Sequence, residues 1–251
     1  MIVDAGDLFF STKKLESWNR KSEEFRAQSI LDGYSKIGYD VVNIGHYEVL
    51  NGLSFLKQVT KNRDIKFISA NLRDSKTGEL IFTPYHIFQK GGLNIGVIGV
   101  TDMLPDTSKT LFADNYIESC RKYIGELSGE VDIIIALINA ERTNQTKLAE
   151  KLDNIDFIIT SGSTNMSRPS SPQKKGGPFL YSCGKQGKYL MSIDVEINDA
   201  QSRFIDVSAE EKKIKNIEKR FERLRKKEPG KRLEEIYKNQ QNILNMIEQY
   251  K

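Results

Sequence analysis

The sequence predicts an α/β protein: a layered sandwich of mixed β-sheets flanked by helices, followed by a C-terminal α-helical hairpin. Three observations lead to this fold class. Strand-like and helix-like stretches alternate from the N-terminus to about residue 207. The chain has 251 residues, of which 38% are hydrophobic and 29% charged, so it can bury a core beneath a well-solvated surface. Beyond residue 207 only helical patterns remain. We therefore expect two domains, residues 1–207 and 208–251.

The first hundred residues predict strands and helices in turn. Apolar side chains recur at helical spacing over 20–37, and Gly38 is expected to end that helix. Residues 80–100 predict an antiparallel strand pair that turns at Gly91-Gly92. The predicted inward face of the first helix consists of Phe25, Ala27, Ile30, Leu31, Tyr34 and Ile37. The other expected elements are strands at 1–5, 39–44 and 66–71 and a helix at 49–61.

Residues 114–207 are expected to complete the α/β domain. The run 131–138 is apolar throughout, which predicts a strand buried on both faces. Residues 161–178 are rich in Ser, Gly, Pro and Lys and predict a loop. Two or three strands are predicted across 179–207. The remaining elements are helices at 114–128 and 142–153 and a strand at 155–160.

The tail differs from the rest of the chain in charge and in periodicity. Residues 209–251 contain 13 Lys and Arg against 8 Asp and Glu, whereas the whole chain has a net charge of only +4. Ser208 and Glu211 form a capping-box pattern, and residues 228–230 interrupt the helical repeat. The apolar seam of the predicted hairpin consists of Ile214, Ile217, Phe221, Leu224, Leu233, Ile236, Ile243, Ile247 and Tyr250.

The basic run at 219–227 raises the question of nucleic-acid binding. Glu218, Glu222 and Glu228 lie at helical spacing from basic neighbours and predict ion pairs along the helix. No aromatic stacking platform accompanies the run. We therefore expect a solvated helix face rather than a nucleic-acid site, and an apolar seam that docks on the domain or on a protein partner.

Composition excludes several classes of site. The chain has two histidines and two cysteines, Cys120 and Cys183, too few for a zinc finger or a His-rich binuclear centre. Two buried thiols are the favoured interpretation of these cysteines, with one disulfide as the alternative. No apolar run approaches the roughly 20 residues that span a bilayer, and no signal-peptide core opens the chain.

Several segments, taken together and in order, resemble bacterial 5′-nucleotidases of the calcineurin-like metallophosphoesterase superfamily. The two that carry most weight are VDAGDLFF at 3–10 and GYDVVNIGHYEVLNGLSFL at 38–56. The resemblance covers about residues 1–200 and implies a phosphate-ester hydrolase fold. The further matching segments are FISANL (67–72), GGLNIGVIGVTD (91–102), VDIIIALIN (131–139) and LDNIDFIITSGSTN (152–165).

The resemblance also implies where two metal ions would be held. These enzymes use the motifs D-x-H, G-D, G-N-H-E, a lone His and G-H-x-H to hold two divalent cations that activate water. Asp7 stands at the bridging aspartate. In the G-N-H-E segment, His46 stands at the asparagine ligand, Tyr47 at the catalytic histidine and Glu48 at the final glutamate. The D-x-H segment is not present, and we expect that a first strand precedes residue 1.

The later motifs have lost their histidines. Asn139 stands at the lone histidine, and Ser163 and Asn165 replace both histidines of the last motif. Hydroxyl and amide oxygens bind first-row metals more weakly than imidazole does. The resemblance therefore implies a degenerate two-metal centre.

Two interpretations of the remaining polar residues stay open. Asp7, His46 and Glu48 could hold a single divalent cation, either Mn, Zn, Mg or Ca. Alternatively, they form a hydrogen-bonded polar cluster at a former active site. The former-cleft positions Tyr47, Asn139, Ser163 and Asn165 are expected at the carboxyl ends of strands, where neutral groups suit a small phosphate-containing ligand.

Two further polar features receive ordinary interpretations. His86 matches no ligand position and is expected to be a strand residue. Lys174-Lys175 could attract phosphate, but a solvated loop explains the pair as well.

Two functions from different classes follow. The first is a 5′-nucleotidase-type phosphoesterase with weak or no activity. The second is a non-catalytic protein that binds through the former cleft or the helical hairpin. The resemblance alone suggests a periplasmic or secreted location.

Overall fold

The computed structural model describes residues 1–105, 109–168, 171, 173–174, 176–184, 187–198, 203–226 and 228–250. These residues divide into two compact units. The α/β unit comprises Met1–Ser167 and Gln173–Ile205, and the second unit comprises Arg168–Pro172 and Asp206–Lys251. No helix among the described residues is long and apolar enough to cross a membrane.

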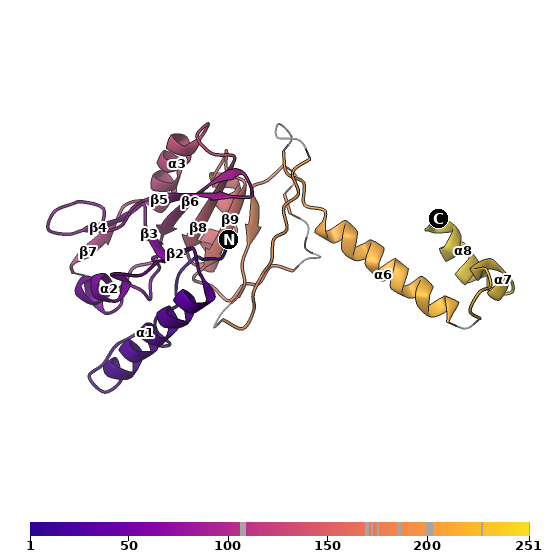
Figure 1. The fold of residues 1–251 in the computed structure, drawn as a ribbon, viewed down its shortest axis with the longest axis horizontal. Coiled ribbons are helices and arrows are strands. Elements are labelled where there is room, and N and C mark those ends of the chain that lie inside the picture. Colours follow the sequence, from indigo (N-terminus) through magenta and orange to yellow (C-terminus); the bar gives the residue numbers. More distant parts are fainter. Residues whose placement is uncertain are drawn as a thin grey trace. The chain divides into compact units, whose positions relative to one another are not determined.

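The α/β unit contains three sheets (Figure 1). A three-stranded parallel sheet has the order β1-β2-β3, and a five-stranded mixed sheet has the order β10-β9-β8-β6-β5. Strands β4 and β7 form a separate antiparallel pair. The strands are β1 (Val3–Asp4), β2 (Val41–Asn43), β3 (Lys66–Ile68), β4 (Leu72–Asp74), β5 (Tyr85–Lys90), β6 (Leu93–Thr101), β7 (Leu111–Ala113), β8 (Ile133–Asn139), β9 (Phe157–Ser161) and β10 (Phe179–Tyr181).

Helices cover the outer faces of the two larger sheets. One hydrophobic cluster joins α1 (Arg20–Ile37) and α2 (Gly52–Thr60) to the three-stranded sheet, and another joins α3 (Tyr116–Leu127) to β6 and β8. A third cluster lies between the sheets and includes Val41 and Leu137. This is the predicted layered sandwich of mixed sheets, which is therefore confirmed.

Most predicted elements are present, with some differences in burial. The antiparallel pair β5–β6 turns at Gly91-Gly92 as predicted, and Gly38 ends α1 in the left-handed conformation at φ 88°. The inward face of α1 is narrower than predicted. Ala27 and Leu31 are buried, but Phe25 and Ile37 remain 71% and 63% exposed, because the sheet that α1 covers has only three short strands.

Two predictions within the α/β unit are wrong. The helix expected at 142–153 is two short helices, α4 (Arg142–Gln145) and α5 (Leu148–Lys151), since the Gln145 amide turns inward to bond Ala140 O and Ser161 O. Of the strands expected across 179–207, the structure forms only β10 within its described residues. Of the described residues after it, Cys183 forms an isolated antiparallel bridge with Met166, and 187–198 and 203–207 pair with no strand.

The second unit is helical, as predicted. It contains α6 (Ser208–Arg225), α7 (Leu233–Ile236) and α8 (Gln241–Gln249), so the second predicted helix is in fact two. The predicted capping box is wrong, because Val207 is the N-cap and Ser208 is already helical. Leu233, Tyr237, Met246 and Ile247 form its buried cluster.

Of the predicted ion pairs in the tail, that of Glu228 is present, with Lys231 three residues along the chain, beyond the end of α6. No salt bridge joins two described residues of α6 itself, so the pairs predicted for Glu218 and Glu222 are not formed. Exposed pairs of long side chains gain little free energy, so the geometry does not enforce them.

Candidate functional site

Polar side chains gather where the parallel strands of both sheets end. Asp7 follows β1, His46 and Glu48 follow β2, and Asn139 and Ser161 close β8 and β9. The carboxyl ends of parallel strands are the usual location of ligands in α/β folds. The structure thus brings most of the predicted site residues into one region.

Glu48 is the most constrained of these residues. It is fully buried, and its two carboxylate oxygens accept four backbone N–H groups. Oε1 accepts from Leu8 (2.7 Å) and Phe9 (3.2 Å), and Oε2 accepts from Asp7 and Gly45 (both 2.8 Å). Burial, and secondarily the charge of Asp7, raise the pKa of Glu48 to about 7. The carboxylate therefore fixes the loop after β1 to the loop after β2.

Asp7 adopts a left-handed conformation, with φ 71°. Its Oδ1 accepts the Tyr47 N–H at 3.1 Å, which joins the same two loops a second time. Gly45 lies between Asp7 and Asn139. A Cβ at position 45 would lie 3.0 Å from Asp7 Oδ1 and 2.9 Å from Asn139 Cγ, so the close approach requires glycine.

Asn139 forms the centre of a hydrogen-bonded network. Its Oδ1 accepts the His46 N–H and the Thr101 hydroxyl, each at 3.1 Å, and its Nδ2 donates to Ser161 Oγ at 2.8 Å. Ser161 Oγ in turn donates to Ala5 O at 2.7 Å. Asn139 is fully buried, so its amide is a structural link between strand ends of the two sheets.

Asn43 makes a second link between the sheets. Its Nδ2 donates to Ala5 O in the three-stranded sheet and to Val100 O in the five-stranded sheet, each at 3.0 Å. This side chain is also fully buried. Neutral amides, rather than charged groups, therefore hold the two sheets together beneath the site.

The other former-cleft positions lie at the edge of this network. Ser163 Oγ donates to Gln145 Oε1 at 2.8 Å and accepts the Asn165 N–H at 3.2 Å. Tyr47 is half-buried, and burial together with the Asp7 charge raises the pKa of its hydroxyl. Its ring meets the His46 ring edge-on at 5.3 Å.

A pocket of about 290 Å³ opens at the end of β6, next to the network. Thr101, whose hydroxyl bonds Asn139, belongs to both. Asp102 accepts a hydrogen bond from Asn144, and burial, followed by the charge of Asp102, raises the pKa of Tyr116. The pocket is lined by Thr101, Asp102, Leu104, Ala113, Asp114, Asn115 and Tyr116.

Known proteins similar to this chain include 5′-nucleotidases and a calcineurin-like phosphoesterase. The chain is 38% identical over 217 residues to the 5′-nucleotidase of Vibrio cholerae, covering 71% of this chain and 39% of that protein. The structure of the calcineurin-like phosphoesterase YfkN from Bacillus subtilis matches with a TM-score of 0.50 and 26% identity, covering 63% of this chain and 56% of that one. This α/β unit belongs to the 5′-nucleotidase-like branch of the calcineurin-like phosphoesterases.

A further solved structure supports the fold of this branch. The 5′-nucleotidase precursor of Thermus thermophilus matches with a TM-score of 0.54 and 24% identity, covering 71% of this chain and 35% of that one. No protein-family model matches the chain. The chain spans about two-fifths of the length of the curated 5′-nucleotidases that it matches.

The residues at the strand ends do not suit the two-metal centre of the calcineurin-like phosphoesterases. Four N–H groups occupy the Glu48 oxygens, and three hydrogen bonds occupy the Asn139 amide. A cation at either group would have to displace bonds that hold the strand ends together. Within the described ranges, no three His, Cys, Asp or Glu side chains are grouped as a metal site. A single cation at Asp7, His46 and Glu48 stays a prediction.

The structure also places His86, the two cysteines and Lys174, for which the sequence gave separate predictions. His86 lies on β5 as predicted, where burial lowers its pKa and its ring packs on Phe88. Both cysteines are free; Cys120 is buried, as the favoured interpretation predicted, whereas Cys183 is only half-buried. Lys174 donates to Ala149 O, whereas Lys175 lies outside the described residues.

Sequence reasoning missed Thr101, Ser161 and Gln145 as parts of the network. Thr101 and Ser161 are the last residues of buried strands, and a polar residue in that position is a signal that could have found them. Gln145 gave no such signal, since it lies in a run of polar residues.

Proposed function

We propose that this protein is a calcineurin-like phosphoesterase relative with little or no two-metal hydrolase activity, in which the former active-site cleft binds a small ligand. The observation that carries the proposal is the burial of Asn139 and the three hydrogen bonds of its amide, at the position where the relatives are expected to place a metal-binding histidine. The amide oxygen already accepts the His46 N–H and shares the Thr101 hydroxyl proton with Met103 O, so a cation there would have to displace these bonds.

The pocket at the end of β6, which adjoins the former cleft through Thr101, is the binding site in this proposal. It lies beside Asn139 and combines carboxylates, an asparagine and a tyrosine with Leu104. The relatives are named 5′-nucleotidases, which supports a small phosphate-containing ligand. A non-catalytic role through the C-terminal helices is the alternative.

The test is metal content by elemental analysis of chelator-free protein, with hydrolysis of p-nitrophenyl phosphate measured with and without Mn²⁺. We expect far less than one metal per chain and no Mn²⁺-dependent turnover. Asp7→Asn is the informative variant, because asparagine tolerates the left-handed conformation and its amide oxygen can still accept the Tyr47 N–H. Stoichiometric metal, with turnover that Asp7→Asn abolishes and Asp153→Asn does not, would overturn the proposal.

A further inference from the structure

A second pocket lies within the α/β unit, on the outer side of the three-stranded sheet. It has a volume of about 450 Å³, within the range of small-molecule sites. One wall is α1, which contributes Gln28, Asp32 and Ser35, residues spaced so that they share one helix face. The other wall is the end of α2 and the turn after it, with Gln58, Val59, Lys61, Asn62, Arg63 and Asp64.

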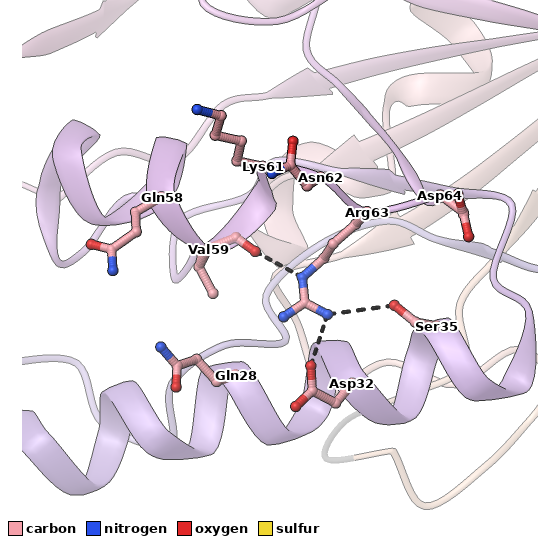
Figure 2. Close-up of a pocket in the computed structure, with 9 residues that line it drawn as sticks. All are labelled: Gln28, Asp32, Ser35, Gln58, Val59, Lys61, Asn62, Arg63 and Asp64. Carbon is pink, nitrogen blue, oxygen red and sulfur yellow. Dashed lines mark hydrogen bonds and ion pairs between the residues drawn. The ribbon is translucent and has the colours of Figure 1, made fainter.

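Arg63 is held rigidly at one end of this pocket. Its side chain is only 17% exposed. Nε donates to Val59 O at 2.8 Å, and Nη1 donates to Asp32 Oδ1 at 2.9 Å and to Ser35 Oγ at 3.4 Å. Nη2 has no hydrogen-bond partner among the described residues, and Figure 2 shows it directed into the gap between the two helices. The guanidinium is therefore already oriented, with one edge unused.

Two carboxamides face the same gap. Gln28 projects from α1 and Gln58 from α2, and both line the pocket; Figure 2 shows them across the gap from Arg63, with Val59 between Gln58 and the guanidinium. Neither amide bonds to another described side chain or backbone group. Each carboxamide can donate and accept, which is what a hydroxyl group requires of its partner.

The charges around the gap favour an anion. Arg63 compensates the Asp32 carboxylate, and the Asp64 carboxylate points away from the gap in Figure 2. Figure 2 shows the Lys61 ammonium directed away from the gap as well, so the free edge of Arg63 is the positive group that faces it. A guanidinium has no acceptor, so a ligand atom against Arg63 must be an acceptor oxygen.

The lining also excludes apolar ligands. Val59 is the single hydrophobic residue among the nine described residues that line the pocket, and no aromatic ring is among them. A nucleobase or an acyl chain would find no surface to stack on or to pack against. We infer that this pocket binds a small, hydroxyl-rich anion, with its anionic group on the free edge of Arg63 and its hydroxyls on Gln28 and Gln58.

Three six-carbon probes test the inference on the full chain: gluconate, sorbitol 6-phosphate and sorbitol. They share the hydroxyl-rich body and differ in the anionic group. Binding is followed by nuclear magnetic resonance, through the Arg63 Nε–H and the Gln28 and Gln58 side-chain amide signals. We expect saturable shifts with at least one anion and about tenfold weaker binding of sorbitol. The tighter anion identifies a carboxylate or a phosphate as the favoured group.

Matched variants separate the pocket from general charge effects. Gln28→Leu and Gln58→Leu should each weaken the binding of the anion about fivefold or more, while Lys13→Gln and Gln89→Leu should leave binding unchanged. The side chains of Gln28 and Gln58 form no hydrogen bond with described residues, so these variants should fold normally. Failure of both anions to saturate, equal binding of sorbitol, or unchanged affinity in both pocket variants would overturn the inference. None of these outcomes depends on the metal content or the hydrolase assay.

Discussion

At the scale of single residues, the site is distinguished by the number of hydrogen bonds that its buried polar side chains form. Glu48 and Asn139 are both fully buried, and together they accept six hydrogen bonds and donate one. Buried polar groups are tolerated when they are bonded and costly when they are not. Substitutions that keep the shape of these side chains but change their donors and acceptors should therefore act on stability.

Glu48→Gln is the sharpest such change. One carboxylate oxygen becomes an NH₂ group, which would face two backbone N–H donors. We expect the free energy of unfolding to fall by about 2–4 kcal/mol in urea denaturation. Glu118→Gln, at an exposed position on α3, is the matched control and should change stability by less than about 0.5 kcal/mol. A Glu48→Gln protein as stable as the control would contradict the role assigned to the carboxylate.

The raised pKa of Glu48 also predicts a pH dependence. The folded-state value of about 7 lies above the ordinary value of 4.5, so folding takes up a proton between these limits. The proton that Glu48 takes up on folding therefore stabilises the folded state below about pH 4.5, and this proton-linked contribution is lost as pH rises towards 7. Between pH 5 and 6.5 we expect a slope of about −1 kcal/mol per pH unit from this group. The slope should be absent in Glu48→Gln, and an equal slope in both proteins would contradict the assignment.

At the scale of elements, the two sheets approach closely at Gly99 of β6. A Cβ there would lie 2.5 Å from Asn43 Oδ1, 2.8 Å from Ile68 Cγ1 and 3.0 Å from Ile68 O. Asn43 cannot move away without breaking its bonds to both sheets. The packing between β6 and the three-stranded sheet thus depends on the absence of a side chain at this position.

Gly99→Ala and Gly125→Ala should have opposite effects. The first should destabilise the protein by about 1–3 kcal/mol, because one sheet must shift. The second lies inside α3 with no atom within 4 Å of the new Cβ, and should stabilise by about 0.5–1 kcal/mol through helix propensity. Thermal unfolding of both variants measures the difference, and destabilisation of similar size in both would show that sheet packing is not the cause.

At the scale of the whole molecule, the two units have separate hydrophobic cores. The cluster around Leu233 draws only on residues from Phe221 to Ile247, whereas the clusters of the α/β unit contain none of these. Separate cores predict that damage to one unit need not reach the other.

Leu137→Ala and Leu233→Ala test this separation. Leu137 is fully buried between the sheets, and its truncation should cost about 2–5 kcal/mol. Hydrogen exchange measured by segment should then accelerate in the α/β unit and leave α6–α8 unchanged, while Leu233→Ala should do the reverse. Acceleration in both units from either substitution would mean that the chain unfolds as one cooperative body.

The sequence by itself determined the alternation of strands and helices, the sandwich and the helical tail. Periodicity and turn residues act locally, so the 20–37 helix and the Gly91-Gly92 turn could be predicted without tertiary contacts. The limits of local signals appear at 142–153 and 179–207. At 142–153 the buried Gln145 side chain accompanies two short helices in place of the predicted one. Across 179–207 the described residues form one strand, β10, in place of the two or three predicted.

Only the tertiary structure decided what the strand-end residues do. The sequence placed Asp7, Glu48 and Asn139 near one cleft, but a carboxylate or an amide at a strand end can bind either a ligand or the protein's own backbone. The choice depends on N–H groups and hydroxyls that are distant in sequence, such as Leu8 for Glu48 and Thr101 for Asn139. The Arg63 pocket could not be predicted from the sequence for the same reason: its two walls meet only when α1 and α2 pack on one sheet.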